Sequence, residues 1–200
     1  MDVLKAEYRD QTIKAKQLRR KGLIPCSIYG ITLDESVLIQ IPLADLNRFL
    51  NRKMKGSTLV IEVGDKKYNV LYKNISREPA SQQIEHLEFQ HLVADEAINS
   101  VVQVVLINKE KNPNMVQQHI EEIPYNALPS HLIEKVTIDL EGMELGASVK
   151  IEDLDIAKNE HIKLLIPEDT MILNVVEASR MAAPTEDEED EADDEVETEE

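Results

Sequence analysis

The sequence of 200 residues contains one cysteine, no tryptophan, two phenylalanines and six glycines. Cys26, the single cysteine, excludes a disulfide within the chain and a zinc site built from several cysteines. With so few aromatic residues, the hydrophobic core has to consist mainly of Val, Ile and Leu. The sequence has no Walker loop, no dinucleotide-binding fingerprint and no G-x-S-x-G motif. These absences argue against the common classes of enzyme.

Long apolar runs are also missing. The first ten residues, MDVLKAEYRD, lack the apolar centre of a secretory signal, and no run reaches the ~20 apolar residues of a membrane span. The five histidines show no metal-ligand spacing with one another or with Cys26. We therefore expect a cytoplasmic protein that is not an enzyme, with no cofactor, no metal, no membrane association and no small-molecule substrate.

Charge is distributed unevenly along the chain. The net charge of −17 argues against nucleic-acid binding, but residues 1–93 hold 15 Lys and Arg against 11 Asp and Glu. Residues 94–184 hold 7 against 16, and residues 185–200 hold 12 acidic residues and no basic one. A phosphate responds to the potential within about a Debye length, ~10 Å. The basic excess of the first segment therefore matters more than the total charge.

Residues 1–93 are expected to form a small β-barrel domain. Short β-prone runs predict six strands, at 3–9, 24–29, 37–41, 59–63, 68–75 and 84–89. Gly64-Asp65 is a tight-turn signal between two of them. Helices are expected at 14–21, which Gly22 would end, and at 43–50, whose apolar residues share one face. Six short strands with two short helices indicate a closed or nearly closed barrel.

Residues 94–180 are expected to form a second, mostly antiparallel β domain. Strands are predicted at 101–107, 136–140, 149–151, 162–166 and 171–176, and one helical turn within 128–132. Pro124, Pro129 and Pro167 would confine their neighbours to edges or turns, and 117–119 indicates a loop. Residues 181–200 combine dense like charge with almost no apolar surface, which predicts a disordered acidic tail. The fold class is thus mainly β with short helices.

A basic cluster is the strongest local feature of the sequence. It comprises Lys14, Lys16, Arg19, Arg20 and Lys21. On a helix, Arg19 and Arg20 lie three and four residues from Lys16, which places these cations on one face. A solvated helix face is the alternative interpretation, but the same domain also holds Lys73, Arg77 and other basic residues. Phosphate contacts from such a surface would set affinity and register without reading sequence.

Three residues are candidates for contacts with bases. Tyr29 ends a strand, where it can stack on a base or ribose, and packing at a barrel rim is an equally good interpretation. His86 and Glu88 alternate with apolar residues, which places both on one strand face. Imidazole can donate or accept a hydrogen bond, and an ionised carboxylate only accepts. The alternative is an ordinary solvent-exposed sheet face.

Residues 18–30, LRRKGLIPCSIYG, resemble the signature of the bacterial large-subunit ribosomal protein twenty-five family. Residues 77–79 (REP) and 85–89 (EHLEF) are similar to two later segments of that family. Residues 141–154 resemble an element of its long form, the general stress protein CTC type. The resemblance covers nearly the whole chain, with the motifs in order. It implies a barrel that binds the loop E region of 5S ribosomal RNA in a structural component of the large ribosomal subunit.

The resemblance also implies which residues contact RNA. By position these are Arg9, Lys16, Arg19, Tyr29, Lys73, Arg77, His86 and Glu88, with Lys14 and Arg20 as neighbours. Thr12 stands where the family has a lysine, Gln17 where it often has an arginine, and Glu88 where it has an aspartate. We therefore expect the sheet to contribute more secure RNA contacts than the helix.

Two other functions fit parts of the sequence. The anticodon-binding barrels of glutaminyl-tRNA synthetase resemble the expected fold, but no nucleotide-binding catalytic domain precedes this barrel. Alternatively, the acidic second domain and tail bind basic protein partners in a stress-linked role, which is compatible with a ribosomal one. Neighbouring ribosomal proteins are the expected partners of the second domain.

Overall fold

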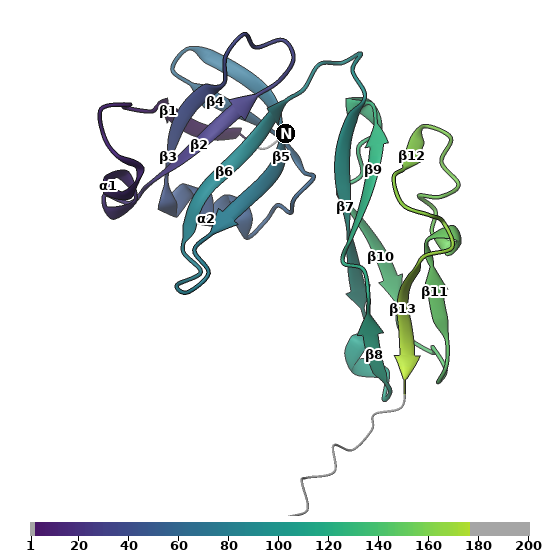
Figure 1. Ribbon diagram of the computed structural model, residues 1–200. Helices are drawn as coiled ribbons and strands as arrows, with labels where there is room; N and C mark the ends of the chain where they lie inside the picture. The colour runs from purple at the N-terminus through teal and green to yellow at the C-terminus, as the bar shows by residue number, and fades with distance from the viewer. Residues whose placement is uncertain (1–2, 177–200) are drawn as a thin grey trace, which may run out of the picture.

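The computed structural model describes residues 3–176, which form a barrel domain and a second β domain (Figure 1). The barrel consists of β1 (Val3–Tyr8), β2 (Leu23–Tyr29), β3 (Val37–Pro42), β4 (Thr58–Val63), β5 (Lys66–Arg77) and β6 (Ile84–His91). Its strand order is β1-β3-β2-β6-β5-β4, closed by the parallel pairing of β1 with β4. The closed barrel confirms the expected fold, and the predicted acidic tail lies outside the described residues.

Alternating apolar side chains fill the barrel interior. Ile28 of β2 and Leu87 and Phe89 of β6 are completely buried there. Burial of each such side chain stabilises the fold by ~1.5–3 kcal/mol. Helix α2 (Leu43–Leu50) adds Leu46 and Phe49 to the same core, and helix α1 (Ala15–Arg20) packs against β2.

Two glycines set the local turns as expected. Gly22 has φ of 77° and follows α1, where its N–H donates to the carbonyl of Arg19 at 3.0 Å. Gly64 has φ of 59° in the loop between β4 and β5, whose flanking residues Val63 and Lys66 pair directly. Glycine tolerates such φ angles because it has no Cβ.

The second domain contains two small sheets. The first has the order β10 (Lys135–Asp139), β7 (Ile98–Ile107), β9 (Glu122–Ala127), β12 (Ile162–Leu164), and the second β11 (Ser148–Lys150), β13 (Met171–Val176), β8 (Met115–Gln118). Short 3₁₀ turns lie at Lys109–Lys111, Pro129–His131 and Ile151–Asp153. Within the described residues of this domain, only β10 and β7 pair in parallel, so a mostly antiparallel domain is confirmed.

Two local predictions in this domain are wrong. Residues 117–119 were expected to form a loop, but β8 (Met115–Gln118) pairs with β13. Pro124 was expected to mark an edge or a turn, but it lies inside β9, opposite Val101 of β7. Its carbonyl accepts from Leu165, just beyond the end of β12. The N–H and the carbonyl of one strand residue point to the same side of the strand. On that side of Pro124 the strand β12 has already ended, so no strand residue requires the N–H that proline lacks.

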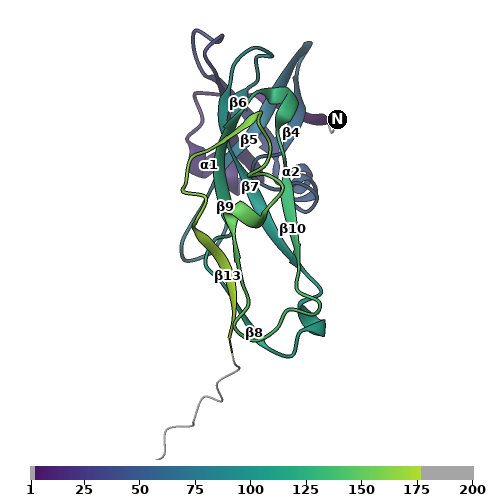
Figure 2. The ribbon, with the colours of Figure 1, turned by 90° about the vertical axis from the view of Figure 1, so that its right-hand side faces the viewer.

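Lysines of the barrel connect the two domains. Lys53 Nζ lies 2.9 Å from a carboxylate oxygen of Glu134, and Lys55 Nζ lies 2.8 Å from one of Glu122. Leu71, on the outside of β5, is nevertheless completely buried, in a region that the second domain covers. Figure 2 looks onto the second domain, which lies in front of the barrel and extends beyond one end of it.

Candidate nucleic-acid interface

Polar side chains line the outer face of β2, β6 and β5. Ser27 of β2 is the Cα partner of Glu88 of β6, and Tyr29 is the partner of Gln90. Asn74 of β5 is also a partner of Glu88. Directly paired residues lie on the same side of a sheet, and here their neighbours fill the barrel core. We call this surface the sheet face, and it comprises Ser27, Tyr29, Asn74, Ser76, His86, Glu88 and Gln90.

The sheet face offers hydrogen-bonding groups of several kinds. Ser27 Oγ lies 3.1 Å from His86 Nε2, and either group can donate, depending on the imidazole tautomer. Burial and the negative charge of Glu88 raise the pKa of Tyr29, so its phenol keeps its O–H donor at neutral pH. The carboxylate of Glu88 adds an acceptor and the Tyr29 ring adds a stacking surface. Such a mixture suits recognition of base edges.

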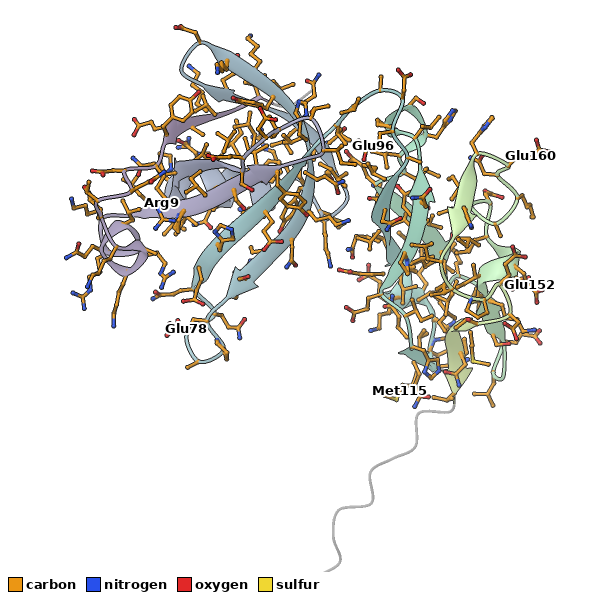
Figure 3. All side chains as sticks on the ribbon, turned by 45° about the horizontal axis from the view of Figure 1, so that its top comes forward. Arg9, Glu78, Glu96, Met115, Glu152 and Glu160 are labelled. Atoms are coloured by element: carbon orange, nitrogen blue, oxygen red, sulfur yellow. The ribbon has the colours of Figure 1, made fainter. Side chains whose placement is uncertain are left out.

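Arg9 extends this surface toward β3. It follows β1, and its backbone N–H donates to the carbonyl of Leu38 at 3.0 Å; Leu38 in turn pairs with Ser27. Figure 3 shows Arg9 on the barrel, well away from the second domain. Arg9 Nε is buried and has no hydrogen-bond partner among residues 3–176. A buried donor without a partner costs ~1–3 kcal/mol, so this position of the Arg9 side chain is unfavourable for the isolated chain.

Helix α1 holds most of the basic cluster. Lys14, Lys16 and Arg20 are exposed. Arg19 is half-buried, and its Nη2 lies 3.0 Å from a carboxylate oxygen of Glu85 at the start of β6. Its Nη1 also donates to the Glu85 carbonyl at 3.4 Å. Four cations of the cluster, Lys21 included, thus face solvent, while Arg19 joins the helix to the sheet.

Lys73 is not part of the sheet face. The register of β5 with β6 shifts between Tyr72 and Asn74, which leaves Lys73 without a Cα partner on β6. Its Nζ donates to the carbonyl of Asn99 in β7, at 2.6 Å, across the junction between the domains. Burial and the nearby charge of Lys55 lower its pKa. The structure therefore places this ammonium group at the domain junction rather than among the other candidates.

Arg77 lies at the end of β5, beside the hairpin that leads to β6. Its Nη1 donates to the carbonyl of Gln82 at 3.2 Å, and the rest of the side chain is exposed. Gln82 has φ of 55°, an uncommon value for a residue with a Cβ. The Arg77 contact helps to hold this turn and leaves further guanidinium donors available.

Thr12 is used within its own loop. Its backbone N–H and its hydroxyl donate to Asp10 Oδ1, at 2.9 and 2.6 Å. These two hydrogen bonds lower the pKa of Asp10. Thr12 therefore shapes the turn before α1 and takes no cationic role, and Lys14 at the helix N-cap is the first exposed cation after it.

Four residues of the sheet face were not singled out from the sequence. They are Ser27, Asn74, Ser76 and Gln90. Strand alternation alone identifies two of them, because Ser27 precedes Tyr29 by two residues and Gln90 follows Glu88 by two. Asn74 and Ser76 could not be assigned to a face, since the register shift at Lys73 interrupts the alternation of β5.

Two other kinds of feature are absent from residues 3–176. No group of three or more His, Cys, Asp or Glu in that range is arranged to hold a metal ion. None of the helices in the same range has the length and apolar character needed to cross a membrane.

Comparison with known proteins identifies the family. The model of the Ribosomal L25p family matches residues 4–89, and that of the ribosomal protein TL5 C-terminal domain matches residues 97–179. The large ribosomal subunit protein bL25 of Halothermothrix orenii is 32% identical over 195 residues, covering 93% of this chain and 88% of the relative. The chain belongs to the ribosomal L25p family, in its two-domain form.

Two further relatives support the same family assignment. The bL25 protein of Dictyoglomus thermophilum is 29% identical over 184 residues, covering 86% of this chain and 88% of the relative. That of Nitrosomonas europaea is 30% identical over 174 residues, covering 82% and 86%. This L25p-family chain is therefore a structural protein of the large ribosomal subunit, and not an enzyme.

Proposed function

We propose that the chain binds the loop E region of 5S ribosomal RNA with the sheet face and Arg9, while α1 adds phosphate contacts. The observation that carries the proposal is the row of neighbouring residues from Arg9 to Asn74 across the strands, in which every residue except Leu38 is polar. Strands of a closed barrel hold such groups in fixed positions, which favours specific recognition. The wide, shallow minor groove of A-form RNA is the side that protein groups can read.

Each group has a chemical role in this proposal. His86 and Ser27 can donate to or accept from base edges and 2′-hydroxyls, and Glu88 accepts from exocyclic amino groups. Arg9 is half-buried and donates from its guanidinium group. Tyr29 stacks on a base or ribose.

The basic residues supply affinity. Lys14, Lys16 and Arg20 meet phosphates, and Arg19 and Arg77 contribute the donors that their contacts within the protein leave unused. Lys73 serves the domain junction in this proposal, because its ammonium group already donates to Asn99.

Replacing His86 with Ala tests the sheet face. Titration of the full chain with 5S ribosomal RNA should show a loss of ~1–3 kcal/mol in binding, as for a base-edge contact. Lys158→Ala, a change at an exposed residue of the second domain, is the matched control and should bind like the unaltered chain. If the His86→Ala variant binds 5S RNA as tightly as the unaltered chain, the sheet face is an ordinary solvated surface.

A salt series on the same complexes separates the two kinds of contact. The logarithm of affinity should fall linearly with the logarithm of salt, with a slope of about −0.7 to −0.9 per phosphate contact. His86→Ala should shift this line without changing its slope, whereas Lys16→Ala should make the slope shallower. A change of slope in the His86 variant would assign His86 to phosphate instead of a base.

A further inference from the structure

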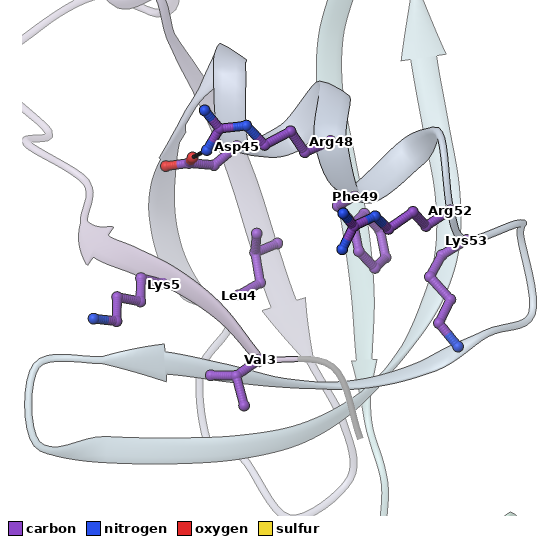
Figure 4. A pocket seen from close by; sticks show the side chains of 8 residues that line it. All are labelled: Val3, Leu4, Lys5, Asp45, Arg48, Phe49, Arg52 and Lys53. Carbon is purple, nitrogen blue, oxygen red and sulfur yellow. Dashed lines mark hydrogen bonds and ion pairs between the residues drawn. The ribbon is translucent and has the colours of Figure 1, made fainter.

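A second basic site lies on the barrel, away from the sheet face. A groove of about 310 Å³ opens between the first residues of β1 and helix α2. β1 is bordered by β3 and β4, whereas the sheet face lies on β2, β6 and β5. Figure 4 shows the groove, with Phe49 and Arg52 reaching toward β1. Its lining residues are Val3, Leu4, Lys5, Asp45, Arg48, Phe49, Arg52 and Lys53.

The lining carries four cationic groups and one acidic group. Arg48 is joined to Asp45, with Nη1 3.1 Å from Oδ1, and Lys53 is joined to Glu134 of the second domain. The Arg52 side chain is exposed and makes no hydrogen bond or ion pair with any residue from 3 to 176. The groove therefore has an excess of positive charge and at least one unpaired guanidinium donor.

Apolar surface accompanies this charge. Val3 is 55% exposed at the start of β1, and Leu4 and Phe49 form the floor of the groove. A compact, strongly hydrated anion needs no such surface, but a nucleotide has both a phosphate and a planar base. Arginine binds phosphate through paired N–H donors, and apolar side chains accept the face of a base. The volume is near the lower end of the ~300–1,000 Å³ of small-ligand sites, which suits one nucleotide unit.

We propose that this groove binds one nucleotide unit of a single-stranded segment of ribosomal RNA, distinct from the RNA on the sheet face. Arg52 holds the phosphate at the rim, and the base or ribose packs on Val3 and Phe49. The proposal rests on the ribosomal family of the chain and not on the 5S RNA assignment of the sheet face. The protein thus joins two RNA segments from different sides of one barrel.

Site-directed cleavage of RNA in assembled large subunits tests the proposal. Cys26, the only native cysteine, is 1% exposed and burial raises its pKa to about 12, so a tethered iron chelate attaches only to an introduced cysteine. Asn51→Cys places the chelate beside the groove, and Ser76→Cys places it on the sheet face; both side chains are exposed. Cleavage from position 51 should fall on a single-stranded segment that position 76 does not cleave.

Absence of cleavage from position 51, or cleavage only within a duplex, overturns the groove proposal. Absence of 5S RNA cleavage from position 76 counts against the sheet-face proposal alone. The two proposals therefore fail separately in one experiment.

A charge reversal at Arg52 provides a second, independent test of the groove proposal. Arg52→Glu should weaken binding of the full chain to a single-stranded 12-nucleotide RNA about tenfold, the effect of one charge-assisted contact. Its affinity for 5S RNA should change less than twofold, and Lys158→Glu should change neither. Equal affinity of the Arg52→Glu variant and the unaltered chain for the single strand contradicts the proposal. A mononucleotide that binds as tightly as the 12-mer and displaces it also contradicts the proposal, because the groove would then bind a free nucleotide instead of a segment of RNA.

Discussion

Arg19 contributes to the fold and, in the proposed function, also contacts RNA. Its guanidinium contacts Glu85 through the carboxylate and the backbone carbonyl, yet about a third of the side chain stays exposed. Arginine has five N–H donors in a planar fork, so two contacts leave others for a phosphate. The pair is partly solvated, and such pairs contribute only ~0–1 kcal/mol to stability. RNA binding and folding can therefore be separated at this residue.

Charge reversal at Arg19 and at Lys16 makes that separation measurable. Arg19→Glu places two carboxylates together and should lower the unfolding free energy by at most ~1 kcal/mol. Lys16→Glu should change stability by less than ~0.5 kcal/mol, because Lys16 is exposed. Both should weaken 5S RNA binding in parallel titrations, with urea denaturation reporting stability. Unfolding of the Arg19 variant, or unchanged RNA affinity of the Lys16 variant, would show that α1 has a different role.

At the scale of elements, Gly56 lies at the junction of the two domains, against the backbone of β7. It has φ of 89°, and a Cβ there would lie 2.2 Å from the carbonyl oxygen of Val101 in β7. No side chain fits at that distance, so the loop after α2 needs glycine for both its conformation and its space. Gly22 has a similar φ of 77°, but a Cβ there would meet nothing within 4 Å.

Alanine at these two glycines distinguishes conformational strain from collision. Gly22→Ala should cost ~1–2 kcal/mol, the strain of a left-handed residue with a Cβ. Gly56→Ala should cost more, because the loop or β7 has to move, and small-angle scattering should show a larger radius of gyration. Equal destabilisation of both variants with unchanged scattering would mean that the domains are not in contact at Gly56.

The elements differ in how far their sequence determines them. The barrel strands were predictable because apolar and polar residues alternate, as at residues 84–90, and because Gly64-Asp65 marks a turn. β8 was not, since its partner β13 lies more than 50 residues away in the sequence and no local pattern encodes that pairing. The prediction for Pro124 was wrong for a related reason. Whether a strand can contain proline there depends on where β12 ends, which the residues around Pro124 do not encode.

The candidate site was predictable to a similar extent. His86 and Glu88 share one face, as their alternation indicated. The pairing of β2 with β6, which no local pattern encodes, adds Tyr29 to that face, and Arg9 joins them through β3. The position of Lys73 depends on an irregular register and on contact with the other domain. Neither can be read from residues near Lys73 in the sequence.

At the scale of the whole molecule, charge segregation also joins the domains. Lys53, Lys55 and Lys73 of the basic domain all bind groups of the acidic one. Burial alone would raise the pKa of Glu122, but hydrogen bonds from Lys55 and Gln103 and the charge of Lys55 outweigh it and lower the pKa. Glu122 is therefore ionised at the junction at neutral pH.

Acidification should weaken this junction. Because folding lowers the pKa of Glu122, its contribution to stability is fully present above its ordinary pKa of about 4.5 and is lost as pH falls through the lower folded value. Glu122→Gln should thus be less stable than the unaltered chain at pH 7 and equally stable near pH 3. Denaturation at both pH values checks this, with Glu160→Gln, an exposed change far from the barrel (Figure 3), as control. A difference that persists at pH 3 would contradict the ionic role.

In the proposed function, the row of residues from Arg9 to Asn74 across the barrel recognises 5S ribosomal RNA. Competition between 5S RNA and transfer RNA for the full chain, at one fixed salt concentration, tests it most directly. We predict that 5S RNA binds more tightly by about 10³-fold or more, the margin that separates specific from non-specific protein–DNA binding. Equal affinity for the two RNAs, or a preference for transfer RNA, would show that the sheet face does not recognise 5S RNA.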